Sequence, residues 1–288
     1  AEMVHEKSEK KSINYDPLGF ASLGNKINEI VVGVSPAFGE KIFQTLAGHR
    51  LSEVLYNLKI GIIRGGYNFR LVTADVFGKE KIDLMRSLGA NLEIIKSSDG
   101  KINKELITQM IKKADEISNE PNTFFTNQLN NHDVIKGFIP LGEEILSQLN
   151  GKVDAVCDTV GTAGTLMGIA KAFKKAKSNC KVIAVEPSSS PILSKGIKGS
   201  HNVEGVGLGF VPKIYDANLV DRVIDIDESK ARKTCKDLAR KEGIFCGTSS
   251  GMNVAAAIQI SKELGPLSRV VTVACDTGLK YLSEGLFD

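Results

Sequence analysis

The sequence predicts a two-lobed α/β fold in which parallel sheets are flanked by helices and a cleft separates the lobes. The chain has 288 residues, more than one small hydrophobic core needs. From about residue 68 onward, short apolar runs alternate with amphipathic stretches, as in β–α units that build parallel sheets. The alternation falls into two blocks, at about residues 45–146 and 147–288, which predicts two sheets.

In the first block, strands are expected at residues 69–73, 92–95 and 124–126. Helices are expected at residues 79–88, 105–117 and 134–149. Gly89 is expected to close the first of these helices. Pro140 should mark or break a turn inside the last one, because proline has no backbone N–H to donate.

In the second block, strands are expected at residues 153–157, 182–185, 223–226 and 270–274. Helices are expected at residues 164–176, 228–241 and 251–264. The first 66 residues are poorly specified, because glycine and proline interrupt short apolar pieces there. Residues 52–63 are a candidate for a single helix, which Gly65 and Gly66 would end.

The composition excludes several classes of protein. Lys and Arg total 37 against 34 Asp and Glu, a net charge of +3, so no nucleic-acid partner is expected. The apolar runs are strand-sized, so no membrane association is expected. Five cysteines without CxxC spacing indicate a reducing cytoplasm rather than disulfides or zinc. Four scattered histidines without an HExxH motif predict no metal site.

The sharpest motif is GTAGTLMG at residues 161–168, directly after the predicted strand 153–157. Its small residues let backbone close around a ligand, and the following helix directs free N–H groups and its positive end toward that ligand. Thr162 and Thr165 add hydroxyl groups, which suits a phosphate monoester. The motif has neither the lysine of a Walker loop nor the GxGxxG spacing of a dinucleotide-binding loop, so it is not one of these two phosphate-binding motifs. The alternative is a tight turn between strand and helix that binds nothing.

Two further motifs are rich in glycine. In GTSSG, residues 247–251, a hydroxyl either caps the following helix or faces a ring nitrogen in the cleft. In VEGVGLGF, residues 203–210, alternating glycines form a flexible connection or let backbone approach a flat cofactor.

Two more motifs carry polar side chains. The amides of QLNN, residues 128–131, either bind a substrate carboxylate or tie a loop together. ACDTG, residues 274–278, ends a strand, where ligand crevices lie in open α/β sheets. Cys275 is expected to be an inert buried thiol, since no histidine lies near it in sequence.

Taken in order, these motifs resemble those of the fold-type-II pyridoxal-phosphate enzymes, in the cysteine synthase and cystathionine β-synthase family. GTAGTLMG is similar to the family's GTGGTxxG phosphate loop, and EGIFCGTSSG to its serine loop. VEP, VEGVGLGFVP and TGLKYLSEGLF are similar to three other family segments. The resemblance covers about residues 66–288 and is greatest to a bacterial cysteine-synthase-like branch. It implies a tryptophan synthase β-like fold, with a large cofactor-binding domain (1–44 and 147–288) and a small, mobile domain (45–146).

The resemblance also implies roles for individual residues. The cofactor, pyridoxal 5′-phosphate, is expected to bind through its phosphate to Gly161, Thr162, Ala163, Gly164 and Thr165. Ser249 is expected to face the pyridine nitrogen, and Gly205 to line the cofactor pocket. Gln128 is expected to help hold the substrate carboxylate. Lys41, in SPAFGEK, corresponds to the lysine of the family's NPxGSVKDR-like motif, which forms the Schiff base with the cofactor.

The implied activity is β-replacement on an activated serine in cysteine biosynthesis. O-acetylserine with sulfide, giving cysteine and acetate, is the first choice of substrates, and serine with homocysteine is the second. A cytoplasmic homodimer is expected from the relatives.

The amino-terminal third departs from the family pattern, because the SGNTG-like loop that binds the substrate carboxylate is missing between Lys41 and Tyr67. Three explanations are open: a catalytically inactive relative, an active enzyme with a rebuilt lobe, or an altered reading of about residues 26–65. The alternative function is therefore an inactive relative that senses a ligand or binds a partner.

Overall fold

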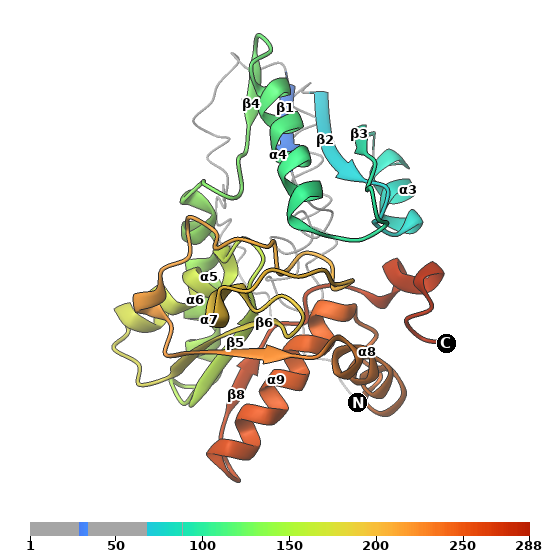
Figure 1. The fold of residues 1–288 in the computed structure, drawn as a ribbon. Helices are drawn as coiled ribbons and strands as arrows, with labels where there is room; N and C mark the ends of the chain where they lie inside the picture. Colours follow the sequence, from blue (N-terminus) through green and yellow to red (C-terminus); the bar gives the residue numbers. More distant parts are fainter. Residues whose placement is uncertain (1–28, 34–67, 88) are drawn as a thin grey trace, which may run out of the picture.

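The computed structural model describes residues 29–33, 68–87 and 89–288, with side chains from residue 68 onward. Two four-stranded parallel sheets form separate blocks, one above the other in the view of Figure 1. The predicted α/β class, with parallel sheets flanked by helices, is confirmed. The predicted helix at residues 52–63 lies outside the described residues.

The first sheet has the strand order β3-β2-β1-β4. Its strands are β1 (Glu29–Gly33), β2 (Asn68–Ala74), β3 (Asn91–Ile95) and β4 (Thr123–Phe125). Sequence analysis missed β1, whose EIVVG run is short and surrounded by glycine and proline. Parallel pairing on both sides makes it an inner strand. The domain boundary at residue 44 stays a prediction, although β1, from the segment assigned to the large domain, pairs within this first sheet.

In the described part of the chain, two helices accompany the first sheet, α3 (Lys79–Ser87) and α4 (Lys104–Ser118). Asn103 begins α4 by accepting a hydrogen bond from the Leu106 N–H at 2.9 Å, as an N-cap side chain does. One face of α4 is buried through Leu106, Met110 and Ala114, which are three or four residues apart. This spacing is why the sequence predicted α4 within one residue at each end.

The second sheet has the order β7-β6-β5-β8 and consists of β5 (Ala155–Thr159), β6 (Lys181–Pro187), β7 (Arg222–Ile226) and β8 (Val270–Thr272). Every residue of β5 is buried, as expected for an inner strand of a parallel sheet covered on both faces. The strand begins two residues later than predicted and ends at Thr159. Only Val160 therefore separates it from the glycine-rich motif.

The remaining helices are α5 (Asp133–Gln148), α6 (Gly164–Lys175), α7 (Ile192–Lys195), α8 (Glu228–Asp237) and α9 (Thr248–Leu264). Short 3-10 helices lie at η3 (Ala217–Leu219) and η5 (Gly278–Glu284), and a short π-helix, η4 (Leu238–Glu242), follows α8. The prediction that Pro140 marks or breaks a turn inside the helix expected at residues 134–149 is wrong, because α5 runs through this proline. Pro140 is exposed, so water can reach the backbone group that its missing N–H leaves without a partner.

No helix in the described ranges is both long enough and apolar enough to cross a membrane.

Helices α5 and α6 lie against each other at glycine contacts (Figure 1). A Cβ on Gly168 would lie 2.3 Å from the Cβ of Phe138, and one on Gly164 would lie 2.3 Å from Cγ1 of Val134. This close approach joins the segment after β4 to the helix after β5.

We expect Gly168→Ala to lower the free energy of unfolding by up to about 2 kcal/mol. Overpacking of the contact with Phe138 by the added methyl costs about 1–3 kcal/mol, and the gain in helix propensity offsets about 1 kcal/mol of this cost. Urea unfolding measures the change. Lys171→Ala, at an exposed position of the same helix, is the control and should stay within about 0.5 kcal/mol of the parent. Equal stability of both variants would contradict the packing argument.

Candidate active site

The predicted phosphate loop is the turn between β5 and α6. The Thr162 hydroxyl accepts a hydrogen bond from the Gly164 N–H at 3.3 Å. The first N–H groups of a helix have no acceptor within the helix, so this turn offers donors at the positive end of the α6 dipole. The first turn of α6 contains no acidic residue that would compete with an anion.

Ala163 is the N-cap of α6 and has a left-handed backbone, with φ at 74°. Side chains disfavour this region because Cβ crowds the following carbonyl oxygen. The turn therefore contains a strained alanine at a position that glycine would occupy without cost.

The glycine-rich segment 203–210 lies beside this turn. The Gly207 N–H donates to the carbonyl oxygen of Val160 at 3.1 Å, next to the phosphate loop. Gly205, Gly207 and Gly209 all have positive φ values, between 59° and 76°. At Gly207 a Cβ would also lie 2.5 Å from Nε2 of His201, so only glycine fits. Burial lowers the pKa of His201, whose neutral ring contacts the Gly207 carbonyl oxygen at 2.9 Å.

Ser249 lies in the first turn of α9 and is 4% exposed. The alternative that a hydroxyl of this motif caps the helix is wrong, because α9 begins three residues earlier than predicted and its N-cap is Gly247. The Ser250 hydroxyl instead accepts a hydrogen bond from the Cys275 N–H at 2.6 Å. The Thr248 hydroxyl is buried without a hydrogen-bond partner in the described part of the chain.

Asn253, one turn further along α9, joins this helix to the end of β5. Its side-chain oxygen accepts from the Thr159 N–H at 2.7 Å, and its amide donates to Asp158 at 2.8 Å. The structure thus brings the serine loop, the glycine-rich segment and the phosphate loop to the carboxyl end of β5.

Gln128 is buried in the segment between β4 and α5. Asn131 holds this segment by donating to the Thr126 carbonyl oxygen at 3.2 Å and accepting from the Asp133 N–H at 2.9 Å. Because Val134 packs against Gly164, the segment approaches the start of α6. The Asn131 side chain therefore holds the loop together, as one of the two predicted roles of this motif requires. The other role, binding of a substrate carboxylate by Gln128, stays a prediction. Lys41 lies outside the described residues, so its predicted role stays a prediction.

A buried charged cluster that sequence analysis missed lies where α3 meets the second block. Lys81 is 2% exposed and forms a short ion pair with Glu204, which is 4% exposed. Its ammonium also lies 3.6 Å from Glu284 and 3.7 Å from the ring centroid of Tyr281. Lysine in an amphipathic helix is usually exposed, so no sequence signal distinguishes Lys81 from its neighbours.

Several acidic groups in this cluster compete for one cation. Burial raises the pKa of Glu204 to about 7; Lys81 opposes this rise, while Glu284 and Asp276 add to it. Burial alone would lower the pKa of Lys81, but the charges of Glu204 and Glu284 raise it. Lys81 therefore keeps its proton, and Glu204 gains one more readily than an ordinary carboxylate.

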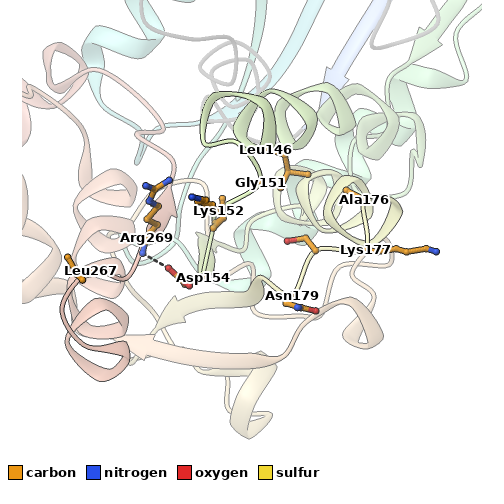
Figure 2. Close-up of a pocket in the computed structure, with 11 residues that line it drawn as sticks. Leu146, Gly151, Lys152, Asp154, Ala176, Lys177, Asn179, Leu267 and Arg269 are labelled. Carbon is orange, nitrogen blue, oxygen red and sulfur yellow. Dashed lines mark hydrogen bonds between the residues drawn. The ribbon is translucent and has the colours of Figure 1, made fainter.

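A surface hollow of about 710 Å³ lies elsewhere, at the amino-terminal ends of β5 and β8. Figure 2 shows Lys152, Lys177 and Arg269 around it, with the Arg269 N–H bonded to Asp154 at 2.6 Å. Ligands of parallel sheets bind at the carboxyl ends of the strands, so this hollow is at the wrong edge of the sheet. None of the predicted site residues lines it.

We expect Ala163→Gly to raise the free energy of unfolding by up to about 1 kcal/mol, because relief of the left-handed strain exceeds the added entropy of glycine. Differential scanning calorimetry without added cofactor measures the change. Ala170→Gly, within the same helix, is the control and should lower stability by about 1 kcal/mol or more. A loss of stability in both variants would contradict the argument that strain at Ala163 outweighs the packing of its buried methyl.

The raised pKa of Glu204 predicts that its contribution to stability falls with rising pH. Between its ordinary value of 4.5 and about 7, the folded state binds a proton that the unfolded state has released. From pH 5 to pH 8, the parent should therefore lose about 1–3 kcal/mol of unfolding free energy relative to Glu204→Gln. Urea unfolding of both proteins at each pH tests this. His201 titrates in the opposite sense, but it is common to both proteins and cancels.

Comparison with known proteins shows which family this chain belongs to. The profile of the family described as "Pyridoxal-phosphate dependent enzyme" matches residues 63–276. A cysteine synthase of Staphylococcus aureus is 35% identical over 229 residues, which are 77% of this chain and 70% of that protein.

Among solved structures, a hydrogen sulfide-producing enzyme of Fusobacterium nucleatum has a TM-score of 0.78 at 31% identity, covering 91% of this chain and 82% of that one. The O-acetylserine-dependent cystathionine β-synthase of Helicobacter pylori has a TM-score of 0.80 at 27% identity, covering 94% and 82%. The predicted fold-type-II architecture is confirmed by these structures. This chain belongs to the pyridoxal-phosphate-dependent enzyme family and is a cysteine synthase-like member of it.

Proposed function

We propose that this protein catalyses β-replacement on an activated serine, with O-acetylserine and sulfide as substrates and cysteine and acetate as products. The observation that carries this proposal is the convergence of the phosphate loop, the glycine-rich segment and the serine loop at the carboxyl end of β5. The similarity to a cysteine synthase and to an O-acetylserine-dependent enzyme supports the choice of substrates.

The residues at this edge fit pyridoxal 5′-phosphate. Backbone N–H groups and the hydroxyls of Thr162 and Thr165 are neutral donors suited to a phosphate, and no carboxylate lies in the first turn of α6. The buried Thr248 hydroxyl, without a described partner, leaves polar capacity beside Ser249. When bound, the cofactor supplies an electron sink for bonds at the substrate α-carbon.

Each site residue has a distinct proposed role. Gly161, Thr162, Ala163, Gly164 and Thr165 hold the phosphate, and Gly205 lets backbone approach the ring. Ser249 meets the pyridine nitrogen with a neutral hydroxyl, which does not force a full positive charge on the ring. This suits expulsion of a β-leaving group, which needs only a moderate electron sink. The side chain of Gln128 holds the substrate carboxylate.

Lys41 is proposed to attach the cofactor and to move the proton at the substrate α-carbon. We further propose that residues 45–146 form a small domain that closes on the substrate and excludes water. The proposed assembly is a homodimer, which light scattering on the purified protein tests.

Two alternatives remain open. Serine with homocysteine is the second choice of substrates, supported by the similarity to a cystathionine β-synthase. An inactive relative that senses a ligand or binds a partner is the alternative of a different class. Its support is the absence of an SGNTG-like sequence between Lys41 and Tyr67.

We expect the protein with pyridoxal phosphate to show a visible absorption band that changes on addition of O-acetylserine, and to release cysteine when sulfide follows. Lys41→Ala should lower turnover by about a hundredfold or more, because both cofactor attachment and proton transfer are lost. Borohydride reduction and peptide mapping should find the cofactor on Lys41. Lys171→Ala, at an exposed position, is the control and should retain activity.

Cofactor on another lysine would reassign the attachment site without affecting the reaction. Cystathionine formed from serine and homocysteine, with no cysteine from O-acetylserine, would select the second pair of substrates. A band that responds to none of these amino acids would favour the inactive relative.

A further inference from the structure

We propose that Lys81 is a positioning residue that holds both the glycine-rich segment and the serine loop in place from α3, outside the predicted cofactor site. This inference rests on the proposed roles of Gly205 and Ser249 in lining that site. It gives a function to Lys81, a buried cation that has no part in the proposed reaction. Figure 1 shows α3 above the carboxyl-terminal segment that ends the chain.

The first path leads from Lys81 to the phosphate loop. Lys81 forms a short ion pair with Glu204, whose other carboxylate oxygen accepts from the Gly78 N–H at 3.4 Å. Glu204 directly precedes Gly205, and two residues later the Gly207 N–H bonds to the Val160 carbonyl oxygen. The position of Glu204 therefore sets where the glycine-rich segment meets the end of β5.

The second path leads from Lys81 to the serine loop. The Lys81 ammonium lies over the ring of Tyr281, whose hydroxyl donates to Asp276 at 2.6 Å. The carbonyl oxygen of Asp276 in turn accepts from the N–H of Gly247, the N-cap of α9, at 3.1 Å. Ser249 lies two residues further along.

A third set of contacts keeps α3 in the position that both paths require. Glu80 accepts hydrogen bonds from the Ser283 N–H at 3.0 Å and from the Ser283 hydroxyl at 2.6 Å. A Cβ on Gly78 would lie 2.5 Å from a carboxylate oxygen of Glu284, so α3 begins in close contact with η5. Helix α3 therefore cannot move away from η5 without breaking these contacts.

Electrostatics make Lys81 the centre of this arrangement. Glu204, Glu284 and Asp276 all act on the one ammonium group. Without that cation, buried carboxylates would face one another, and a buried charge whose partner is removed is strongly destabilising. Glu204 would then protonate or move toward water, and Gly205 would move with it. A positioning role therefore predicts effects at both loops, whereas a purely local ion pair predicts effects at α3 alone.

The test compares Lys81→Met with the double variant Lys81→Met/Glu204→Gln, which removes cation and carboxylate together. Lys79→Met is the matched control, since Lys79 is 83% exposed and, among the described residues, pairs across one turn with Asp83, at 3.3 Å. Two quantities are measured on the full chain: the dissociation constant of pyridoxal phosphate by titration, and hydrogen exchange of residues 203–210 and 246–250. Neither requires turnover.

For Lys81→Met we expect cofactor binding weakened by about tenfold or more and faster exchange in both segments. In the double variant, hydrogen exchange of the glycine-rich segment should return part of the way to the parent rate, because no unpaired carboxylate remains at residue 204. Lys79→Met should match the parent within about twofold.

Faster exchange confined to residues 78–87 and 278–284, with cofactor affinity unchanged, would overturn the proposal. If Lys81→Met does not fold, the double variant is compared with the parent by the same two measurements, cofactor affinity and hydrogen exchange, and this comparison tests the proposal. If the parent turns over no amino acid but Lys81→Met still changes exchange in both segments and cofactor affinity, the inference is supported and the proposed reaction is refuted. If the parent binds no cofactor, exchange in the two segments remains the deciding measurement.

Discussion

The side chain of Asn253 makes the contacts on which the arrangement of the site depends. It accepts from the Thr159 N–H and donates to Asp158, both in β5, and it also donates to the Val273 carbonyl oxygen just after β8. One buried amide thereby joins α9 to two neighbouring strands of the second sheet. Because these groups are buried, removing the Asn253 amide would take these bonds from polar atoms that water does not reach. The start of α9, with Ser249, is consequently held against the end of β5.

The phosphate loop and the cluster around Lys81 are two different electrostatic environments. The phosphate loop offers neutral donors and the positive end of α6, so it attracts an anion without a formally charged side chain. The cluster around Lys81 has a cation and several carboxylates, all largely removed from water. The glycine-rich segment, from Glu204 to Gly209, connects the two environments.

Sequence analysis succeeded where local chemistry determines the result. The helical spacing of apolar residues in α4 and the apolar run of β5 can be recognised from neighbouring residues in the sequence. The ends of both elements were therefore predicted within two residues. Prediction failed where the outcome depends on neighbours distant in sequence. Pro140 continues a helix because that position faces water, and β1 is a strand because β2 and β4 pair with it. The hydroxyl of Ser250 bonds to a segment 25 residues away rather than capping α9.

The fold class and the individual motifs could be predicted from the sequence, because strand and helix periods and glycine-rich turns depend on residues close together in the chain. The order of those motifs indicated the family by resemblance. Which motifs meet, and which charges are buried, depends instead on how the two blocks pack. Lys81 and Glu204 are 123 residues apart, and nothing in either neighbourhood predicts that they form an ion pair. Burial is a property of the assembled fold, and a lysine in an amphipathic helix acquires its buried acidic partners only when the blocks pack together.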